Sequence, residues 1–280
     1  MKKISRRSFL AAAAVSVAAL ALTACGGSAS TASSAAASSV AASSEAASTS
    51  AAAAELTTVE AGKLTMATNA TFPPYEMTTD AGTIEGIDVD TAQAIAEKLG
   101  LELQIDDMDF DAALLSVQQG KADIAMAGIT VTDERMAVMS FSDSYATGIQ
   151  SIIVPEGSDI ASPDDLAGKT IGTQRGTTGY IYCSDDFGDD NVVAYDDGLT
   201  AVQALNNGQV DAVVIDNAPA QEFVAANPGL KVLDTSYAEE DYAIGMAKGS
   251  ALEDAVNKAL EELKADGTLQ AIVDKYINAN

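Results

Sequence analysis

The sequence predicts an α/β protein whose folded part consists of two similar lobes. Segments with the pattern of strands alternate with amphipathic, helix-like segments along most of the 280 residues, an order typical of α/β domains with mostly parallel strands. One pattern, a helix followed by a glycine, two residues, an aspartate and a buried strand, occurs at 115–128 and again at 203–216. We interpret this repeat as two lobes of about 100 residues each. The alternative is that any two strand–helix units look alike.

The first half of the folded part begins with a strand at 63–68. Asp88 is the predicted N-cap of a helix at 89–99, because the apolar residues of this segment fall on one face, and Gly100 ends the helix. The further predicted elements are a strand at 101–105, a helix at 111–119 and a short buried strand at 123–127.

The second half repeats this alternation after the apolar run 152–154. Ser162 and Pro163 are typical of a helix start, in which a capping side chain precedes a proline in the first turn. The pattern then predicts a strand at 169–173, a helix at 200–207, a strand at 211–215, a helix at 251–265 and a short amphipathic helix that ends at Tyr276.

The residues before Lys63 are predicted to serve export and anchoring. Residues 1–24 combine a basic start with an apolar stretch of about 14 residues, as in a signal peptide, and the paired arginines leave both the Sec and the Tat route open. Cys25 follows Leu-Thr-Ala, which resembles a lipobox, and is the predicted lipidation site. The alternative is an ordinary signal with a chance cysteine. The segment 25–62 is rich in Ala and Ser and is predicted to be a disordered tether.

The amino-acid composition excludes several classes of function. With 41 acidic and 15 basic residues the formal net charge is -26, which argues against nucleic acid or anionic lipid as a partner. The chain contains no histidine, so histidine-ligated zinc and Ser-His-Asp or Cys-His catalysis are excluded. Its two cysteines, Cys25 and Cys183, are too few for a disulfide scaffold or a four-cysteine metal site, and Cys183 is expected to be an inert thiol. We expect no metal and no cofactor.

Polar or glycine-rich segments follow four of the predicted strands. These segments are 69–72, 127–130, 174–178 and 216–217. In open α/β sheets ligands bind beyond the carboxyl ends of the strands. Two lobes that face each other would therefore bring the four segments into one cleft.

Two charged side chains near this cleft suit the two ends of an α-amino acid. The guanidinium group of Arg135 has the planar fork that matches a carboxylate, and Asp216 can accept hydrogen bonds from an ammonium group. The Thr130 hydroxyl and free N–H groups near Gly128 and Thr177, the latter at a helix N-terminus, would add donors.

Each of these residues also has a structural interpretation. Arg135 could form a surface ion pair with one of the two acidic residues before it, Asp216 could cap a helix, and residues 176–178 could form a plain strand-to-helix turn. Phe72 and Phe110 either flank the ligand or pack in the core and at the rim.

A series of segments resembles the polar amino-acid-binding proteins of ABC importers, family 3 of the extracellular solute-binding proteins. The resemblance covers residues 63–276, and its most specific parts are the run Ala-Gly-Ile-Thr-Val-Thr-Asp-Glu-Arg at 127–135 and the order of the motifs. The other matching segments are 68–76, 86–90, 108–110, 141–143, 164–169, 176–178, 211–216 and 263–268.

The resemblance implies a type II periplasmic-binding-protein fold, with two α/β lobes joined by a two-stranded hinge. Lobe 1 would comprise 63–146 and 243–280, lobe 2 would comprise 147–242, and the chain would cross near 146–149 and 241–243. Arg135 would bind the ligand carboxylate and Asp216 the α-amino group. The residues that the resemblance places in the ligand site are Asn69, Phe72, Phe110, Gly128, Thr130, Arg135, Gln174, Thr177, Thr178 and Asp216, with Tyr242 as a weaker candidate at a hinge crossing.

The resemblance also implies a role in transport. The protein would be a monomeric lipoprotein on the outer face of the cytoplasmic membrane that captures a polar amino acid and delivers it to an ABC permease with its ATPase. The alternatives on the same fold are an amino-acid sensor and an enzyme similar to cyclohexadienyl dehydratases, for which Glu76, Asp109 or Asp216 would be the candidate acid.

The expected ligand is polar and uncharged. The motifs at 108–110 and 127–135 look most like those of glutamine-binding members. Asn69 stands where the family usually has an aspartate, so a charge that could hold a basic side chain is missing. Gln174 and Arg175 share a position that is often basic or polar. We therefore expect a glutamine-like amino acid.

Overall fold

The folded body begins before the predicted boundary at Lys63. The computed structural model of the chain describes residues 56–277. The predicted signal peptide, the lipidation site Cys25 and the tether up to residue 55 lie outside the described residues. Leu56 packs against the hydrophobic core, and the Val59 N–H group donates a hydrogen bond to Asp123 Oδ1 at 2.7 Å. The last residues of the predicted tether thus contact the folded body.

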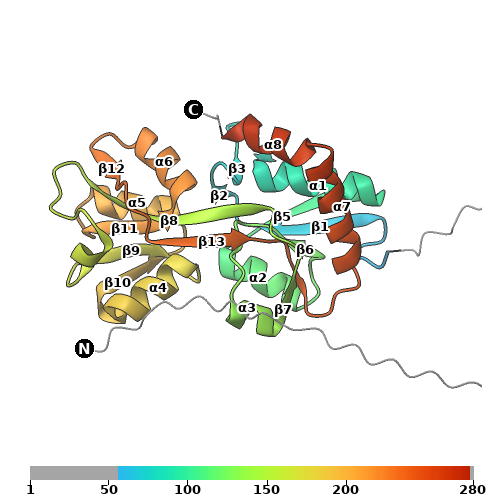
Figure 1. Ribbon diagram of the computed structural model, residues 1–280, viewed down its shortest axis with the longest axis horizontal. Helices are drawn as coiled ribbons and strands as arrows, with labels where there is room; N and C mark the ends of the chain where they lie inside the picture. The colour runs from blue at the N-terminus through green and yellow to red at the C-terminus, as the bar shows by residue number, and fades with distance from the viewer. Residues whose placement is uncertain (1–55, 278–280) are drawn as a thin grey trace, which may run out of the picture. The chain divides into compact units, whose positions relative to one another are not determined.

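The first sheet combines strands from both ends of the described chain (Figure 1). Its order is β5-β1-β6-β14-β7, in which β1 pairs in parallel with β5 and β6, whereas β14 pairs antiparallel with β6 and β7. The strands are β1 Lys63–Thr68, β5 Glu102–Asp107, β6 Ile124–Ala125, β7 Met139–Phe141 and β14 Gly245–Ala247.

The second sheet has the order β10-β9-β11-β8-β12, with β13 also paired to β8. The prediction of mostly parallel strands is wrong here, because β8 pairs antiparallel with β11, β12 and β13, and the parallel pairs are those of β9 with β10 and β11. Parallel pairing requires a crossover connection, usually a helix. β8 enters the second sheet directly from the first sheet, without such a helix. The strands are β8 Ala146–Pro155, β9 Ile171–Gln174, β10 Val192–Tyr195, β11 Ala212–Asp216, β12 Leu230–Val232 and β13 Ala238–Tyr242.

A small antiparallel sheet follows β1 and places Phe72 next to Glu76. It consists of β2, β3 and β4, and Phe72 of β2 pairs with Glu76 of β3. The strands are β2 Thr71–Phe72, β3 Glu76–Thr78 and β4 Ile84–Glu85.

Most predicted helices are present within one or two residues of their predicted bounds. At the start of α1, however, the predicted cap Asp88 is a buried residue of the first turn, and the N-cap is Gly86 with φ 142°. No bounds were predicted for α3, α4 and α6, although helix starts at Thr177 and Asp216 were considered, since these segments offer no clear apolar periodicity. The helices are α1 Ile87–Leu99, α2 Phe110–Gln118, α3 Asp133–Val138, α4 Thr178–Phe187, α5 Gly198–Asn206, α6 Asn217–Ala226, α7 Glu253–Ala265 and α8 Thr268–Tyr276, with 3-10 turns at Pro163–Leu166 and Asp189–Asn191.

Helices cover both faces of each main sheet, because the strands alternate between two apolar faces. On β1, Leu64 packs with α1 and α7, whereas Ala67 packs with α2. On β11, Ile215 packs with α5 and α6, whereas Val214 packs with α4. We refer to the first sheet with α1, α2, α3, α7 and α8 as lobe 1, and to the second sheet with α4, α5 and α6 as lobe 2. No helix within residues 56–277 has both the length and the apolar character needed to span a membrane.

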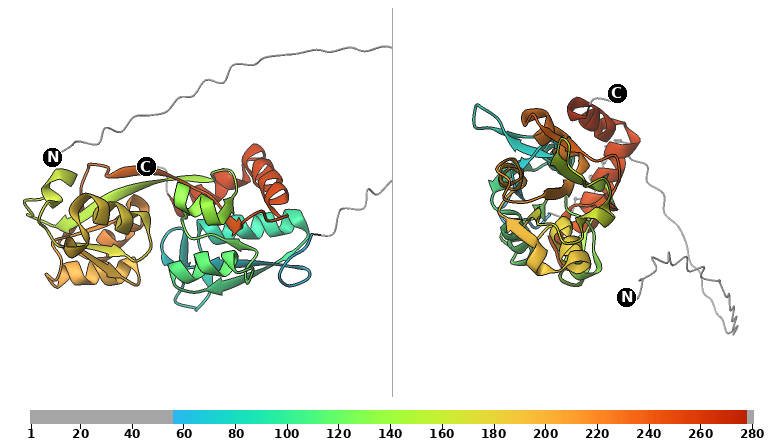
Figure 2. Two further views of the ribbon diagram at one scale, coloured as in Figure 1. Left: turned by 90° about the horizontal axis from the view of Figure 1, so that it is seen from below. Right: turned by 90° about the vertical axis from the view of Figure 1, so that its left-hand side faces the viewer.

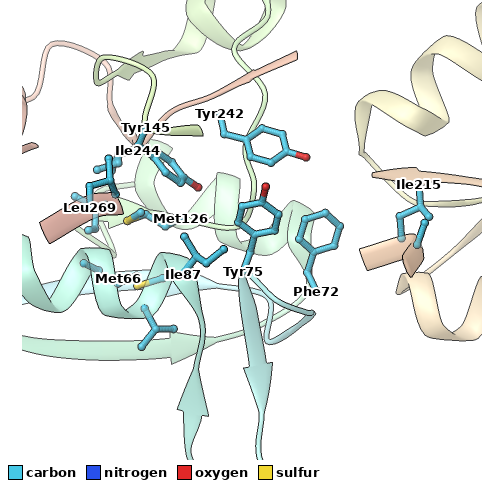
Figure 3. Packing of buried hydrophobic residues seen from close by; sticks show 14 of the residues in the cluster. Met66, Phe72, Tyr75, Ile87, Met126, Tyr145, Ile215, Tyr242, Ile244 and Leu269 are labelled. Atoms are coloured by element: carbon cyan, nitrogen blue, oxygen red, sulfur yellow. The ribbon is translucent and has the colours of Figure 1, made fainter. Parts of the chain in front are cut away.

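Two long strands connect the lobes. β13 pairs with the first half of β8, with Ala238 opposite Gln150 and Tyr242 opposite Ala146, and both strands run side by side from one sheet to the other (Figures 1 and 2). A buried aromatic group lies beside this crossing. The rings of Tyr75 and Tyr242 meet edge to face with centres 5.3 Å apart, and Tyr242 points toward the strand that carries Ile215 (Figure 3).

Candidate functional site

A narrow pocket lies between the lobes, where the loops after β1 and β6 of lobe 1 meet the ends of β9 and β11 of lobe 2. Its inner space is about 10 Å³, room for about one water molecule, because the lobes touch across it. The ten residues that the sequence assigned to a ligand site all line this pocket. Glu76 and Ala127 line it as well.

Arg135 enters the pocket from the third position of α3. The helix begins after Thr132, whose hydroxyl accepts the Arg135 N–H group at 3.2 Å. The guanidinium group donates to the carbonyl oxygen of Thr130 at 2.8 Å and to that of Gly176, in lobe 2, at 3.1 Å. It also lies over the ring of Phe110, 5.3 Å from the ring centre. Phe110 therefore packs against the cation at the pocket, and the guanidinium group bridges both lobes.

The charge of Arg135 has no direct counter-ion. The side chain is 8% exposed, and among residues 56–277 it forms no ion pair with a carboxylate. The interpretation as a surface ion pair is therefore wrong. Burial lowers the pKa of Arg135, and the field of nearby acids opposes this shift. A buried cation without a carboxylate partner in the described part of the chain is a favourable place for an anion.

Asp216 faces the pocket from the end of β11 in lobe 2. It occupies the N-cap position of α6 but forms no capping hydrogen bond, so it does not have the role of a helix cap. Its Oδ1 atom is in contact with the hydroxyl group of Tyr242. Burial, followed by the negative charge of Glu240, raises the pKa of Asp216 to about 8. The raised pKa favours the neutral form of this carboxyl group as long as no ligand ammonium group lies beside it.

The amide groups of Asn69 and Gln174 meet across the pocket. Gln174 Nε2 donates to Asn69 Oδ1 at 2.8 Å, and Asn69 Nδ2 donates to the carbonyl oxygen of Met108 at 3.0 Å. Asn69 comes from the loop after β1, and Gln174 is the last residue of β9. The two lobes thus share a hydrogen bond between two neutral amide groups, each of which can also bond to a polar group of a ligand.

Free N–H groups were expected near Gly128 and near Thr177, and they are found only at the second place, where α4 begins. The Gly128 N–H group donates to Asp88 Oδ2 at 3.0 Å, because a φ of 55° turns it toward α1. A Cβ atom at Gly128 would lie 2.7 Å from the Phe72 ring, which explains the glycine. Thr177 caps α4: its hydroxyl accepts from Tyr180 N and donates to the Gln174 carbonyl oxygen. Because Thr177 also accepts the Ile181 N–H group, the first-turn donors of α4 that remain are the N–H groups of Thr178 and Gly179.

Two acidic groups lie behind the pocket, where the sequence had suggested other roles: Glu76 was a candidate acid of the alternative enzyme, and Asp88 was a predicted helix cap. Glu76 and Asp88 are fully buried, and neither oxygen of Glu76 nor Oδ1 of Asp88 has a hydrogen-bond donor in the described part of the chain. Burial, and next the charge of Asp88, raise the pKa of Glu76 well above its usual value, and burial raises that of Asp88 to about 6. Protonated Glu76 can donate to Asp88. The sequence feature that could have indicated the burial of Glu76 is its place directly after Pro-Pro-Tyr, among mostly apolar residues.

Residues 64–279 match the family model described as bacterial extracellular solute-binding proteins, family 3. The chain belongs to this family. The resemblance noted in the sequence is confirmed, as is the α/β fold with periplasmic-binding-protein architecture.

Relatives of the chain bind amino acids. It is 32% identical over 226 residues to the L-cystine-binding protein TcyJ of Escherichia coli K12, covering 79% of this chain and 85% of the relative. It is 32% identical over 224 residues to the arginine-binding extracellular protein ArtP of Bacillus subtilis 168, covering 76% and 86%.

Solved structures of the family have the same fold. The arginine-, lysine-, histidine-binding protein ArtJ of Geobacillus stearothermophilus superposes with a TM-score of 0.75 at 35% identity, covering 78% of this chain and 96% of the other. An ancestral arginine-binding protein bound to glutamine gives a TM-score of 0.74 at 41% identity, covering 77% and 98%. This family 3 protein is therefore an extracellular or periplasmic amino-acid-binding protein of an ABC transporter and not an enzyme.

Proposed function

We propose that this family 3 protein captures one polar L-α-amino acid between its lobes and delivers it to an ABC permease with its ATPase. The observation that carries the proposal is the pair Arg135 and Asp216, which are buried, come from different lobes and line one pocket. Lobe 1, residues 63–146 with 243–280, and lobe 2, residues 147–242, close around the ligand by rotation about β8 and β13.

The carboxylate of the ligand binds at Arg135. The guanidinium group is held in place by carbonyl oxygens of both lobes and has no competing carboxylate within 56–277. The first turn of α4, which starts at Thr178, lies at the same pocket, and the N–H groups of Thr178 and Gly179 at this helix N-terminus favour a negative charge. A ligand carboxylate thus gains donors from both lobes only when they are closed.

The ammonium group of the ligand binds at Asp216. A cation next to this carboxyl group lowers its pKa again, so binding drives the Asp216 proton off. Asp216 is supported from behind by Tyr242, whose ring is fully buried. One end of an α-amino acid thereby meets a buried cation that has no carboxylate partner among residues 56–277, and the other end meets a buried carboxyl group that ionises as the ammonium group binds.

The ligand side chain lies against Asn69 and Gln174. A side chain that ends in an amide can exchange hydrogen bonds with both, which supports a glutamine-like ligand, and a protonated Glu76 leaves this end of the pocket uncharged. A second candidate is a cationic side chain such as that of arginine. It is favoured by the two Glu76 oxygens without donors and by the arginine-binding relatives.

Isothermal titration calorimetry of the purified protein against the amino acids and cystine tests the proposal. We expect one polar amino acid to bind at about micromolar Kd, around -8 kcal/mol. If the ligand is cationic, Glu76→Gln will abolish its binding, whereas a glutamine-like ligand will bind this variant as before. Glu97→Gln, on the exposed face of α1, is the control. Absence of binding by every amino acid would refute the proposal.

We further propose that the protein is a monomer anchored by a lipid on Cys25 to the outer face of the cytoplasmic membrane, with 26–55 as tether. The support is the lipobox-like sequence before Cys25 and the Ala/Ser-rich composition after it. Cys25→Ala is expected to release the protein from the membrane fraction, whereas Cys183→Ala is not. Retention of the Cys25→Ala protein on the membrane would contradict the lipid anchor.

A further inference from the structure

The hinge strand β13 turns two polar side chains toward the binding pocket. Its residues alternate, so that Glu239 and Asp241 are exposed while Glu240 and Tyr242 are buried. Tyr242 contacts Asp216 of lobe 2. Glu240 accepts a hydrogen bond from Thr130 of lobe 1. One strand therefore supports polar groups on both sides of the pocket.

Glu240 is a buried carboxylate that accepts two hydrogen bonds on one oxygen. Its Oε2 atom accepts from Thr130 Oγ1 at 3.1 Å and from Gln150 Nε2 at 3.0 Å. Its Oε1 atom is buried and has no hydrogen-bond partner among residues 56–277. Thr130 lies in the loop after β6 of lobe 1 and Gln150 on β8, so Glu240 connects the pocket to the hinge. A carboxylate in this arrangement acts only as an acceptor.

This acceptor sets the direction of the neighbouring hydroxyl groups. A threonine hydroxyl has a single hydrogen, and that of Thr130 is directed to Glu240. The Oγ1 atoms of Thr130 and Thr178 are 3.4 Å apart. Since Thr130 has no second hydrogen, Thr178 must be the donor of this pair. The hydrogen bonds therefore run in one direction, from Thr178 in lobe 2 through Thr130 in lobe 1 to Glu240.

We propose that Glu240 is a positioning residue that makes the Thr130 hydroxyl an acceptor for the ammonium group of the ligand. Because its hydrogen is engaged by Glu240, Thr130 presents only lone pairs to the pocket. The sequence had assigned a donor role to this hydroxyl, which the geometry reverses. The inference rests on the proposed function and adds a rule for ligand choice. The site requires a donor group on the α-carbon, held by Thr130 and Asp216 together.

Replacement of Glu240 by glutamine tests this role. The amide has the same size and keeps its oxygen toward Thr130 and Gln150, since both donate to that place, but it is neutral and therefore holds the Thr130 hydrogen less strongly. We expect the affinity of Glu240→Gln for the best amino acid to fall about tenfold, the difference between a charged and a neutral network. The preference for the amino acid over its 2-hydroxy-acid analogue, which lacks the ammonium group, should fall as well. Calorimetry measures the Kd of the amino acid and that of the analogue, and their ratio gives the preference.

A double-mutant cycle separates this role from a purely structural one. Thr130→Val keeps the shape but removes the hydroxyl, and we expect it to weaken binding to a similar extent as Glu240→Gln, with no further loss when both are combined. Glu239→Gln is the matched control, because it makes the same charge change at the exposed neighbour in β13. Its affinity should equal that of the wild type.

The outcomes that overturn the inference are distinct from failure of the proposed function. Wild-type affinity in Glu240→Gln would overturn the role of Glu240 while leaving the proposed function intact. The same holds if Glu240→Gln lowers the affinity of the Thr130→Val protein as much as it lowers that of the wild type. If Glu240→Gln does not fold, Thr130→Val decides alone, and wild-type affinity in that variant would refute the inference. If the wild-type protein binds no amino acid, both proposals fail together.

Discussion

At the scale of single residues, Arg135 is the group on which binding depends most. Its guanidinium group is buried and bridges both lobes, and among residues 56–277 it lacks a carboxylate partner. Arg135→Ala should weaken ligand binding at least about a hundredfold, because two charge-assisted hydrogen bonds of about 1.5–3 kcal/mol each are lost. The protein should remain folded, as shown by circular dichroism. Lys121→Ala, the loss of an exposed cation, is the control. A Kd within tenfold of the wild type would remove Arg135 from the site.

Ligand affinity should depend on pH through Asp216. Its pKa is raised to about 8 in the ligand-free protein by burial and by Glu240, and an adjacent ammonium group requires the ionised form. Below pH 8 the proton must leave before the ligand binds, so affinity should rise with pH by up to about tenfold per unit between pH 6 and 8. Titrations in two buffers of different ionisation enthalpy should report the released proton. A Kd that is constant over this range would contradict the assignment.

The stability of the protein should carry a signature of Glu76. Its pKa is raised well above the usual value in the folded state, so between the two pKa values the native state binds more protons than the unfolded state. Stability is therefore lost as pH rises through this window. Glu76→Gln cannot ionise, so its stability relative to the wild type should grow by up to about 1.4 kcal/mol per pH unit above pH 4.5. Urea unfolding at pH 5, 6 and 7 measures this. A difference independent of pH would show that Glu76 is not held protonated.

The sequence predicts which residues gather at the pocket better than it predicts what they do there. Residues at the carboxyl ends of strands meet because of the α/β topology, so Asn69, Thr130 and Asp216 could be placed together. Direction of hydrogen bonding could not be predicted, since it depends on partners distant in sequence, such as Glu240 for Thr130. The burial of Glu76 beside Asp88 could not be predicted, because composition treats every acid as a solvated charge.

At the scale of elements, the β8–β13 pair is a packed hinge that tolerates little extra volume. Gly148 of β8 faces the buried ring of Tyr242, and a Cβ atom there would overlap that ring. Gly148→Ala should displace Tyr242 from Asp216, lower the free energy of unfolding by about 1–3 kcal/mol and weaken ligand binding. Thermal unfolding and calorimetry measure the two effects.

Ile149→Ala is the control for this substitution, because Ile149 lies next to Gly148 in β8 but is 37% exposed. Its effect on binding should be small. If Gly148→Ala binds and unfolds like the wild type, then the contact between Tyr242 and Asp216 does not depend on the packing of the hinge.

Helix positions were more predictable than strand directions. Apolar periodicity and terminal glycines located α1 and α7 closely, since both are long and amphipathic. Parallel pairing was over-predicted, because the same buried strand pattern serves parallel and antiparallel neighbours. The strands that cross between lobes, β8 and β13, have antiparallel partners that no local pattern specifies.

At the scale of the whole molecule, the two lobes already touch across the pocket. Arg135 with Gly176, Asn69 with Gln174, and Thr130 with Thr178 are contacts between lobes. Because the pocket has room for about one water molecule here, an amino acid must replace some of these contacts with its own, and by contacting both lobes it stabilises a closed arrangement over open and unfolded states. At a concentration a thousand times its Kd, the right amino acid should add about 4 kcal/mol to the stability, visible as a raised Tm. The Arg135→Ala protein should show no such shift, and a shift of wild-type size in it would indicate binding elsewhere.

A crystal structure of the protein with the amino acid selected by calorimetry tests the central claim most directly. We predict a single ligand molecule between the lobes, with its carboxylate on the guanidinium group of Arg135, its ammonium group on Asp216 and its side chain toward Asn69 and Gln174. A ligand bound outside this pocket, or bound in it without contact to both Arg135 and Asp216, would contradict the account.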